Sequence, residues 1–465
     1  YFRQRQQQGA FDLIAVTDPQ GFQISAPAPL PQSYANVPGN ESLFANVIYT
    51  NDDLFGGFLK LQGYYRENEF INPGSDIRAA PLPPWFPGLW QTGQDANEIG
   101  VRAEYTRDFF DMVEITVGGD YTREDYFNTL LITDPTNFNT TGFFDGSTET
   151  FQSPPNVLTS YGAFLQAQVE VTDEMSVSGG VRYDTFSFSL DPYDVVFDFP
   201  IQAGVRQGGD GGADGFTFNF GGTYAVTDDV TVFANFGQGF LIPAVGFAAN
   251  QVQPGVPLGL ADALEPIKTT SYDIGVRGTE GPVDFALAGF FSSSELGDNL
   301  TLGQAGIGQR VRSPQRNYGF EVALNWRATE DLTLGTTITW NDGEFDANDT
   351  GNFTAINSLF VDPIKITANA DYQVTENLNL FASLFHVGNR TRAFEQGTDR
   401  NPPDSYTLVD VGAGYVLGDF DLGLQVTNLF NEDYASVFQS TFIPGRRRSG
   451  PGRAVWLSAA YNFEH

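Results

Sequence analysis

Cysteine is absent from this chain of 465 residues, and histidine occurs only twice, as His386 and His465. The chain therefore has no disulfide, no thiolate nucleophile and no cysteine-based zinc or iron–sulfur site. Histidine is too scarce to supply general bases, and the sequence carries no Gly-x-Ser-x-Gly elbow, phosphate-binding loop or His-Glu-x-x-His motif. We expect neither enzyme activity nor a resident cofactor.

Basic residues are also few. The chain has 24 Lys and Arg against 57 Asp and Glu, which gives a formal net charge of -33. A surface this acidic repels nucleic acid and anionic lipid. A nucleic-acid partner is therefore not expected.

Long apolar runs are missing as well. No stretch reaches the roughly eighteen apolar residues of a transmembrane helix, and the polar residues 1–8 do not form an apolar secretion segment. We expect that an N-terminal part is missing. In contrast, the chain is rich in glycine (51), phenylalanine (42) and tyrosine (19), and only 17% of its residues are charged. This composition suits strands that face lipid.

The clearest pattern is a long amphipathic hairpin in residues 159–184. Tyr161, Leu165 and Val169 fall on one face at period two, whereas Gln166 and Glu170 fall on the other. After the polar turn at residues 172–174 the alternation resumes. Strands of about ten residues or more, joined by tight turns, are the unit of a transmembrane barrel.

The same pattern recurs along the chain. Further hairpins are predicted for residues 43–50 with 58–66 (turn at 51–53), 98–107 with 113–123, 216–226 with 230–240, 271–278 with 283–291, 320–327 with 332–340, 364–374 with 378–385, and 407–416 with 420–430, before a last strand at 454–463. The proline-rich residues 72–95 and the Gly/Asp-rich residues 208–215 are predicted loops.

Short turns and long loops thus alternate along the chain, which is the asymmetry of outer-membrane barrels. A soluble sandwich or propeller does not need strands this long. The sequence predicts an all-β, transmembrane, antiparallel β-barrel with about seventeen or eighteen strands, including a partial strand near Tyr1.

Three segments carry a family resemblance. Residues 232–246 (VFANFGQGFLIPAVG), 264–278 (LEPIKTTSYDIGVRG) and 426–435 (VTNLFNEDYA) resemble, in order and spacing, the C-terminal signatures of TonB-dependent outer-membrane receptors. The resemblance covers most of the chain from about Leu43 onward. It implies a bacterial outer-membrane protein of a Gram-negative-type envelope.

The resemblance also implies a 22-stranded barrel filled by an N-terminal plug that contacts TonB. Counting hairpins backward from Phe463, residues 1–465 are expected to be the C-terminal barrel domain, beginning in the fifth strand, with the plug and the first strands absent. Glu464 and His465 follow the aromatic residue on which the family usually ends. The TonB-ExbB-ExbD system would act through the missing part, and a monomer is expected.

Within the family, residues 290–298 (FFSSSELGD) and 311–324 (VRSPQRNYGFEVAL) look most like receptors for ferric siderophores of the hydroxamate and aerobactin kind. Such a ligand is often anionic and rich in oxygen, which suits arginine. The candidate ligand-binding arginines, all expected on external loops, are Arg310, Arg312, Arg316, Arg390, Arg392, Arg446, Arg447 and Arg448. Contact with lipopolysaccharide phosphates, or simple solvation, is the alternative role for these arginines.

Aromatic and acidic segments complete the candidate site. Trp85, Phe86 and Trp90 are expected to cover the ligand or to pack within a proline-rich loop. Residues 342–352 (DGEFDANDTGN) offer closely spaced carboxylates but lack the closing glutamate of a calcium loop, so a solvated acidic loop is expected. His386 is expected to be a strand residue at the rim, which disfavours a haem receptor.

The function expected from the sequence is therefore TonB-dependent uptake of a ferric siderophore, with iron carried only as part of the ligand. The alternatives are a passive porin with an acidic lumen, which bilayer conductance would reveal, and a receptor of the same fold for cobalamin, a sugar or nickel.

Overall fold

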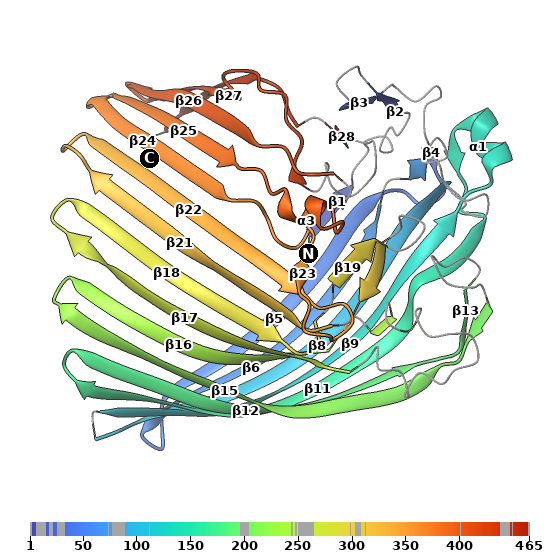
Figure 1. The fold of residues 1–465 in the computed structure, drawn as a ribbon, viewed down its shortest axis with the longest axis horizontal. Coiled ribbons are helices and arrows are strands. Elements are labelled where there is room, and N and C mark those ends of the chain that lie inside the picture. Colours follow the sequence, from blue (N-terminus) through green and yellow to red (C-terminus); the bar gives the residue numbers. More distant parts are fainter. Residues whose placement is uncertain are drawn as a thin grey trace.

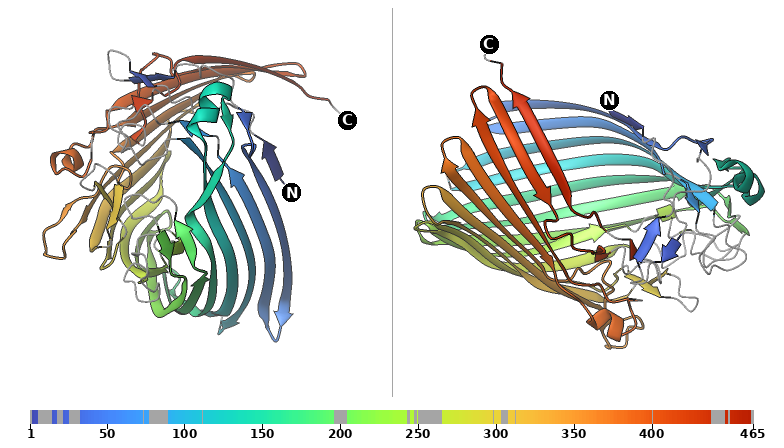
Figure 2. Two further views of the ribbon diagram at one scale, coloured as in Figure 1. Left: turned by 90° about the vertical axis from the view of Figure 1, so that its right-hand side faces the viewer. Right: turned by 90° about the horizontal axis from the view of Figure 1, so that it is seen from above.

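The structure is a computed structural model that describes residues 2–5, 15–17, 22–25, 33–72, 74–76, 89–110, 112–195, 204–242, 245–246, 249, 265–297, 299–302, 308–311, 313–399, 401–437, 447–448 and 450–463. Twenty strands form one sheet that curves into a barrel wall (Figures 1 and 2). None of the helices in these ranges is long and apolar enough to cross a membrane.

The wall strands follow the chain in order (Figure 1). They are β1 (Phe2–Arg5), β5 (Gly39–Leu54), β6 (Gly57–Ile71), β8 (Leu89–Phe109), β9 (Val113–Ile132), β11 (Thr148–Thr172), β12 (Met175–Leu190), β15 (Gly209–Thr227), β16 (Val230–Leu241), β17 (Ile267–Glu280), β18 (Val283–Ser294), β21 (Gln315–Arg327), β22 (Leu332–Phe345), β24 (Lys365–Thr375), β25 (Leu378–Val387), β26 (Tyr406–Leu417), β27 (Phe420–Thr427) and β29 (Ala454–Tyr461).

Each wall strand pairs antiparallel with its neighbours in this order, from β1 with β5 through β27 with β29. The twenty strands include two short ones, β7 (Ser75–Asp76) and β23 (Thr354–Ala355), so the number of full wall strands agrees with the prediction. Short turns close one end of the wall, and the long connections gather at the other, called the loop end.

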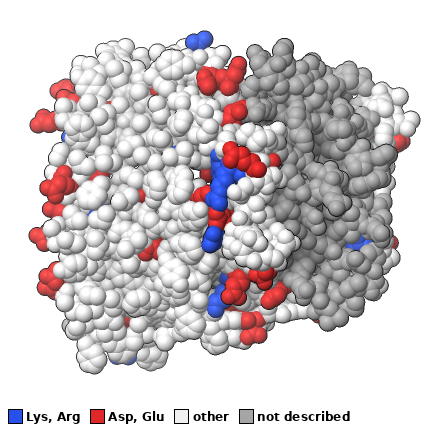
Figure 3. All heavy atoms as spheres, in the orientation of Figure 1, with Lys and Arg blue, Asp and Glu red and all other residues white. Residues whose placement is uncertain are grey.

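The two faces of the wall differ as predicted. In β11, Tyr161 and Leu165 point to the apolar side and are 53% and 47% exposed, and the Tyr161 ring lies 5.0 Å from that of Tyr121 on β9. We call this apolar side the outer face and the opposite side the lumen face. Figure 3 shows a broad band of the outer face that is almost free of charged side chains, with charges along its two margins.

The first predicted turn was placed too early. Residues 51–53 still belong to β5, where the register with β6 shifts between Asn51 and Leu54. The chain reverses at Phe55 and Gly56 instead, with φ values of 53° and 75°. A two-residue turn with both residues at positive φ matches the twist of the flanking strands, and glycine adopts it without strain.

The predicted loop at residues 208–215 was wrong, because β15 begins at Gly209. Its first residues continue the ladder with β12, where Gly209 pairs with Leu190 and Gly215 with Asp184. A Cβ atom at Gly211 would collide with the ring of Phe188. The glycines therefore mark a close approach within a strand, which composition alone does not distinguish from a loop.

The predicted loop at 72–95 was too long at its C-terminal end, because β8 begins at Leu89. Leu89 is fully buried and packs with Phe138 and Phe144. A second cluster joins Phe188, Leu190, Tyr193, Ile242, Val245 and Ala249. The buried apolar clusters of the described residues thus lie among the loop-end segments.

The smaller elements occupy the loop end. They are β2 (Ala15–Thr17), β3 (Phe22–Ser25), β4 (Ser33–Tyr34), β10 (Phe143–Phe144), β13 (Tyr193–Val195), β14 (Gly204–Arg206), β19 (Asn299–Leu302), β20 (Gly308–Val311) and β28 (Arg447–Arg448), with the helices α1 (Pro135–Thr141) and α3 (Arg392–Glu395). Helix α1 is capped by Asp134, whose carboxylate accepts a 2.9 Å hydrogen bond from the Thr136 amide.

Candidate functional site

The lumen face carries ion pairs that neutralise one another. Arg182 on β12 donates to Asp120 at 2.8 Å and contacts Asp184 at 2.6 Å. The Phe164 ring lies between two guanidinium groups, 5.8 Å from that of Arg182 and 5.3 Å from that of Arg102. This part of the lumen therefore presents rigid, paired charges rather than bare ones.

Glycine makes room for this group. A Cβ atom at Gly162 would overlap the Arg182 guanidinium, because Gly162 pairs with both Asp120 and Asp184 and lies beneath that side chain. The close packing fixes the plane of the guanidinium against its two carboxylates.

Aromatic side chains line the loop end near the last strands. The Tyr406 ring lies 4.7 Å from that of Tyr434 and 6.2 Å from that of Phe385. Burial, followed by the nearby Asp410 carboxylate, raises the pKa of Tyr434, which follows the last residues of β27. These rings offer flat apolar surface with hydroxyl groups, which suits a ligand that combines carbon chains with oxygens.

The third resemblance segment holds this aromatic group in place. Asn428 follows β27 at a φ of 47° and is 5% exposed. Its side chain accepts from the Glu432 amide at 2.8 Å and donates to the Glu432 and Pro451 carbonyls at 3.0 and 3.1 Å. The asparagine thus reverses the chain after the strand and positions the segment that carries Tyr434.

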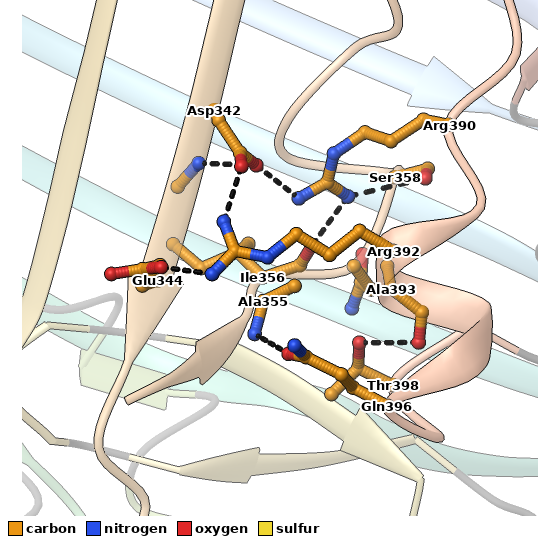
Figure 4. A network of polar contacts seen from close by, with 12 residues as sticks. Asp342, Glu344, Ala355, Ile356, Ser358, Arg390, Arg392, Ala393, Gln396 and Thr398 are labelled. Carbon is orange, nitrogen blue, oxygen red and sulfur yellow. Dashed lines mark hydrogen bonds and ion pairs between the residues drawn. The ribbon is translucent and has the colours of Figure 1, made fainter. Parts of the chain in front are cut away.

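Three of the predicted arginines meet in one polar network, and Figure 4 shows two of them, Arg390 and Arg392. Arg316 donates to Glu344 through Nε at 2.7 Å and Nη2 at 2.5 Å. Arg390 Nη2 lies 2.8 Å from Asp342, and Arg392 bridges Asp342 and Glu344. We call these five residues the arginine network. The network joins β21, β22 and the connection from β25 to β26.

Arg390 is the buried member of the arginine network, with 7% of its side chain exposed. It also donates to the Ile356 carbonyl at 2.6 Å and to Ser358 Oγ at 3.3 Å. Asp399 in turn accepts from the amide and hydroxyl of Ser358 at 2.8 and 2.6 Å. Two loop-end connections are therefore fastened to each other and to β22.

The register places Arg316, Asp342 and Glu344 of the arginine network on the outer face. Arg316, Tyr318 and Phe320 alternate on β21 and pair with Glu344, Asp342 and Trp340 on β22. Phe320 stacks on Trp340 with 5.6 Å between ring centroids, and both rings belong to the lipid-facing side. In both views of Figure 2, α3, which begins with Arg392, lies across the barrel from β5 to β9.

An aromatic ring of side chains marks the interface of a membrane barrel, so we take Phe320 and Trp340 as the loop-end border of the membrane-spanning part. Asp342 and Glu344 lie beyond this border. Burial alone would raise their pKa, but the hydrogen bonds from the arginines outweigh it, and the pKa of both carboxyl groups is held below its usual range. Both are therefore charged at neutral pH.

The expected solvated acidic loop at residues 342–352 was wrong for its first half. Asp342 and Glu344 belong to β22, and Glu344 and Asp346 are only 6% and 2% exposed. Asp346 accepts from the Asn348 amide at 3.3 Å and from the Gly351 amide. These carboxylates are engaged by arginines and backbone amides, and the described residues contain no group of three or more acidic or histidine side chains placed to hold a metal.

The other predicted residues are placed as follows. Trp90 lies in β8 and, by register with Ile132, on the lumen face near the loop end. Arg310 lies in β20, paired with β19, and Arg447 and Arg448 form β28, paired with β3.

His386 lies on β25, where its Nδ1 is 2.9 Å from Thr407 Oγ1, which confirms a strand position. Trp85, Phe86, Arg312 and Arg446 lie outside the described residues.

Ligand contact by any of these side chains stays a prediction. The acidic partners of Arg316, Arg390 and Arg392 were missed, although a signal for the outer-face position was present. Extending the alternation of Phe320 and Trp326 backward reaches Arg316, and extending that of Ile338 and Trp340 forward reaches Asp342 and Glu344.

A family comparison identifies the barrel. The model described as "TonB dependent receptor-like, beta-barrel" matches residues 2–429 of this chain. The chain belongs to this family. A TonB-dependent receptor-like barrel is a protein of the outer membrane of Gram-negative bacteria, so the apolar outer face described above is the surface that contacts lipid.

Curated relatives of this receptor-like barrel are named as receptors. The rhizobactin receptor of Rhizobium meliloti (strain 1021) is 27% identical over 418 residues, which cover 85% of this chain and 54% of that protein. The ferric aerobactin receptor of Escherichia coli is 24% identical over 436 residues, which cover 86% of this chain and 56% of that protein. The chain spans about half the length of the curated relatives it matches.

Solved structures share the fold. The copper transporter OprC superposes with a TM-score of 0.72 at 18% identity, over 92% of this chain and 66% of that chain. The ferric yersiniabactin uptake receptor FyuA from Yersinia pestis superposes with a TM-score of 0.63 at 16% identity, over 92% of this chain and 62% of that chain. At these identities the likeness concerns the architecture of the receptor-like barrel alone.

Proposed function

We propose that this chain is the barrel of a receptor for TonB-dependent uptake of a ferric siderophore. The observation that carries the proposal is the similarity to receptors named for rhizobactin and ferric aerobactin, which extends over 85% and 86% of the chain. The protein is then a transport receptor without catalytic activity or resident cofactor, and iron is its cargo.

The proposal includes a plug domain encoded upstream, through which TonB, ExbB and ExbD would act on a monomeric barrel. Its support is the length of the relatives, because the matched segments cover only 54% to 56% of those proteins. A plug of ordinary domain size, about 100 to 150 residues, fits within the remainder.

Ligand capture is proposed for the loop end of the lumen face. Trp90, Phe385 and Tyr434 bring aromatic surface there, and oxygen-rich ferric ligands suit arginine donors on the loops. The proposed contacts among the sequence candidates are Trp85, Phe86, Trp90, Arg310, Arg312, Arg446, Arg447 and Arg448. For Arg316, Arg390 and Arg392, the pairing with carboxylates on the outer face supports a role in fastening loops instead.

Cobalamin is a second candidate ligand, because a vitamin B12 transporter of Photobacterium profundum is 22% identical over 434 residues. Binding of labelled ligands to de-energised cells that express the full-length gene separates the two. We expect saturable binding of a ferric citrate-hydroxamate siderophore and none of cobalamin. Binding of cobalamin alone would replace the siderophore proposal, and binding of neither, together with an open conductance in a planar bilayer, would indicate a passive porin.

A further inference from the structure

A shallow cavity lies on the lumen face of the wall near the short turns. Its volume is about 630 Å³, and residues of β16, β17, β18, β21, β22 and β24 line it; Figure 1 shows these strands side by side. Arg277 on β17 shares the lumen face with Ala286, its partner on β18, and Ala286 pairs in turn with Ala323 on β21. Both alanines are exposed. They form a low floor beside the arginine, because an alanine side chain ends at Cβ.

Arg277 is the cation of this cavity whose donors are free. The residue is exposed, and it forms no hydrogen bond or ion pair with any residue that the structure describes. In contrast, Arg327 on the same face contacts Asp284 at 2.5 Å, and Asp284 also accepts from Thr279 Oγ1 at 2.8 Å. All five N–H donors of the Arg277 guanidinium are therefore available to a ligand.

The acidic residues of the cavity lie on its turn side. Asp228 and Asp229 form the exposed turn between β15 and β16, and Asp284 is the second residue of β18 and is compensated by Arg327. Like charges repel, so an anion is kept away from this side. The favourable position for an anion is over Ala286, which lies two residues further from the turn.

Neutral hydroxyl groups border that position. Thr231 pairs with Arg277, and Thr337 pairs with Ala323. The Thr337 hydroxyl lies 2.6 Å from that of Thr367. One free guanidinium group with hydroxyl groups beside it suits a carboxylate, which accepts several hydrogen bonds and pairs with arginine in a planar arrangement.

The cavity lies toward the periplasm. Strand β17 ends at Glu280, so Arg277 is about 10 Å along the strand from the turn, and the short turns of outer-membrane barrels face the periplasm. A ligand taken up from outside reaches this level of the lumen after it has left the loop end.

We propose that this cavity binds a carboxylate of the transported ligand on its way to the periplasm, with Arg277 donating to the carboxylate oxygens. The ligand class rests on the proposed function, because that function supplies an anionic, oxygen-rich ferric ligand. The site is separate from the aromatic group at the loop end, and it acts on passage rather than on capture.

Arginine footprinting tests the site itself. Residues 1–465, purified and refolded in detergent micelles, are treated with phenylglyoxal, a reagent for free guanidinium groups, with and without millimolar citrate. Peptide mass spectrometry gives the rate at each arginine. We expect Arg277 to react at least threefold faster than Arg327, and citrate to slow Arg277 at least threefold without changing Arg327. Sodium chloride at equal ionic strength is the control for screening. No slowing by citrate, or equal slowing by chloride, would overturn the proposal.

Ala323→Leu separates the cavity from the arginine. The substitution fills the floor and leaves the guanidinium group, and the exposure of Ala323 to the lumen leaves room for the larger side chain. We expect Arg277 to react with phenylglyoxal at its unaltered rate in this variant, and the protection by citrate to be lost. Full protection in Ala323→Leu would overturn the cavity as the binding site.

Uptake by cells that express the full-length gene tests the role in passage. We expect R277Q to lower the rate of TonB-dependent uptake at least threefold and to leave ligand binding at the cell surface unchanged. An unchanged uptake rate in R277Q would overturn this role. A lack of uptake by the unaltered receptor would contradict the proposed function instead, and citrate footprinting, which needs neither TonB nor a siderophore, distinguishes the two failures.

Discussion

Arg390 Nη2 lies 2.8 Å from Asp342 Oδ1, although 48 residues separate them in the chain. The contact fastens the connection between β25 and β26 to the end of β22, and it is nearly closed to solvent, with side chains 7% and 14% exposed. Loops that begin on two different hairpins are thereby held as one unit.

We expect Arg390→Ala to destabilise the folded barrel by about 2 kcal/mol, because it removes one of the two arginines that compensate the nearly buried Asp342 carboxylate. Reversible urea unfolding in lipid vesicles would measure the loss. Arg123→Ala, at an exposed ion pair, should cost less than about 1 kcal/mol. Equal effects of the two substitutions would show that the buried contact adds nothing beyond a surface pair.

The loop connections should loosen in acid. The pKa values of Asp342 and Glu344 are depressed in the folded state, so their stabilisation is fully present above the unfolded values of about 4 and is lost as pH falls through the folded values. Amide hydrogen exchange at Ile356 and Ser358, corrected for its intrinsic pH dependence, should show constant protection from pH 8 to 5 and a loss below about 4.

Burial raises the pKa of Asp399, so protonation of this residue stabilises the fold as the pH falls, opposite to Asp342 and Glu344. The double variant D342N/E344Q keeps Asp399 and lacks the other two carboxylates, so it serves as the reference. Its protection should be low and should lack the loss below about pH 4. A variant profile that still falls in this window like that of the unaltered chain would assign the acid transition to other groups.

Gly162→Ala should disturb the lumen ion pairs, because the added Cβ atom would overlap Arg182. We expect a destabilisation of about 1 to 3 kcal/mol in urea unfolding. Gly237→Ala on β16 is the control, since a Cβ atom there meets no other atom within 4 Å. A cost at Gly162 no greater than at Gly237 would mean that Arg182 moves aside freely.

Adjacent residues of one strand should face different solvents, and a chain without cysteine allows a direct test. Leu324 is on the outer face and Asn325 on the lumen face of β21. In lipid nanodiscs, we expect a water-soluble maleimide to label Asn325→Cys at least tenfold faster than Leu324→Cys. Faster labelling of Leu324→Cys would reverse the assignment of the faces.

Local alternation was sufficient to predict most of the wall, because a strand with one lipid-facing side must repeat every second residue. The hairpin at Tyr161 and Leu165 is an example. The first turn was misplaced because Asn51 to Asp53 favour turns by composition, while Gly56 supplies the backbone conformation that the reversal requires.

The site was less accessible from the sequence. Arg316, Arg390 and Arg392 were recognised as unusual in an acidic chain, but their carboxylate partners lie 28 to 50 residues away in the chain. Pairing over such separations is set by how the loops fold over the wall. Arg316 was predicted on an external loop, although extending the period-two alternation would have placed it on the outer face of β21. The position of α3 depends on tertiary packing.

Uptake of radioactive iron by cells that express the full-length gene tests the central functional claim most directly. The cells are offered the ferric citrate-hydroxamate siderophore, with and without a working TonB. We predict saturable uptake that disappears without TonB, while binding to the cell surface remains. Uptake that continues unchanged without TonB would contradict the account of this barrel as part of an energised receptor.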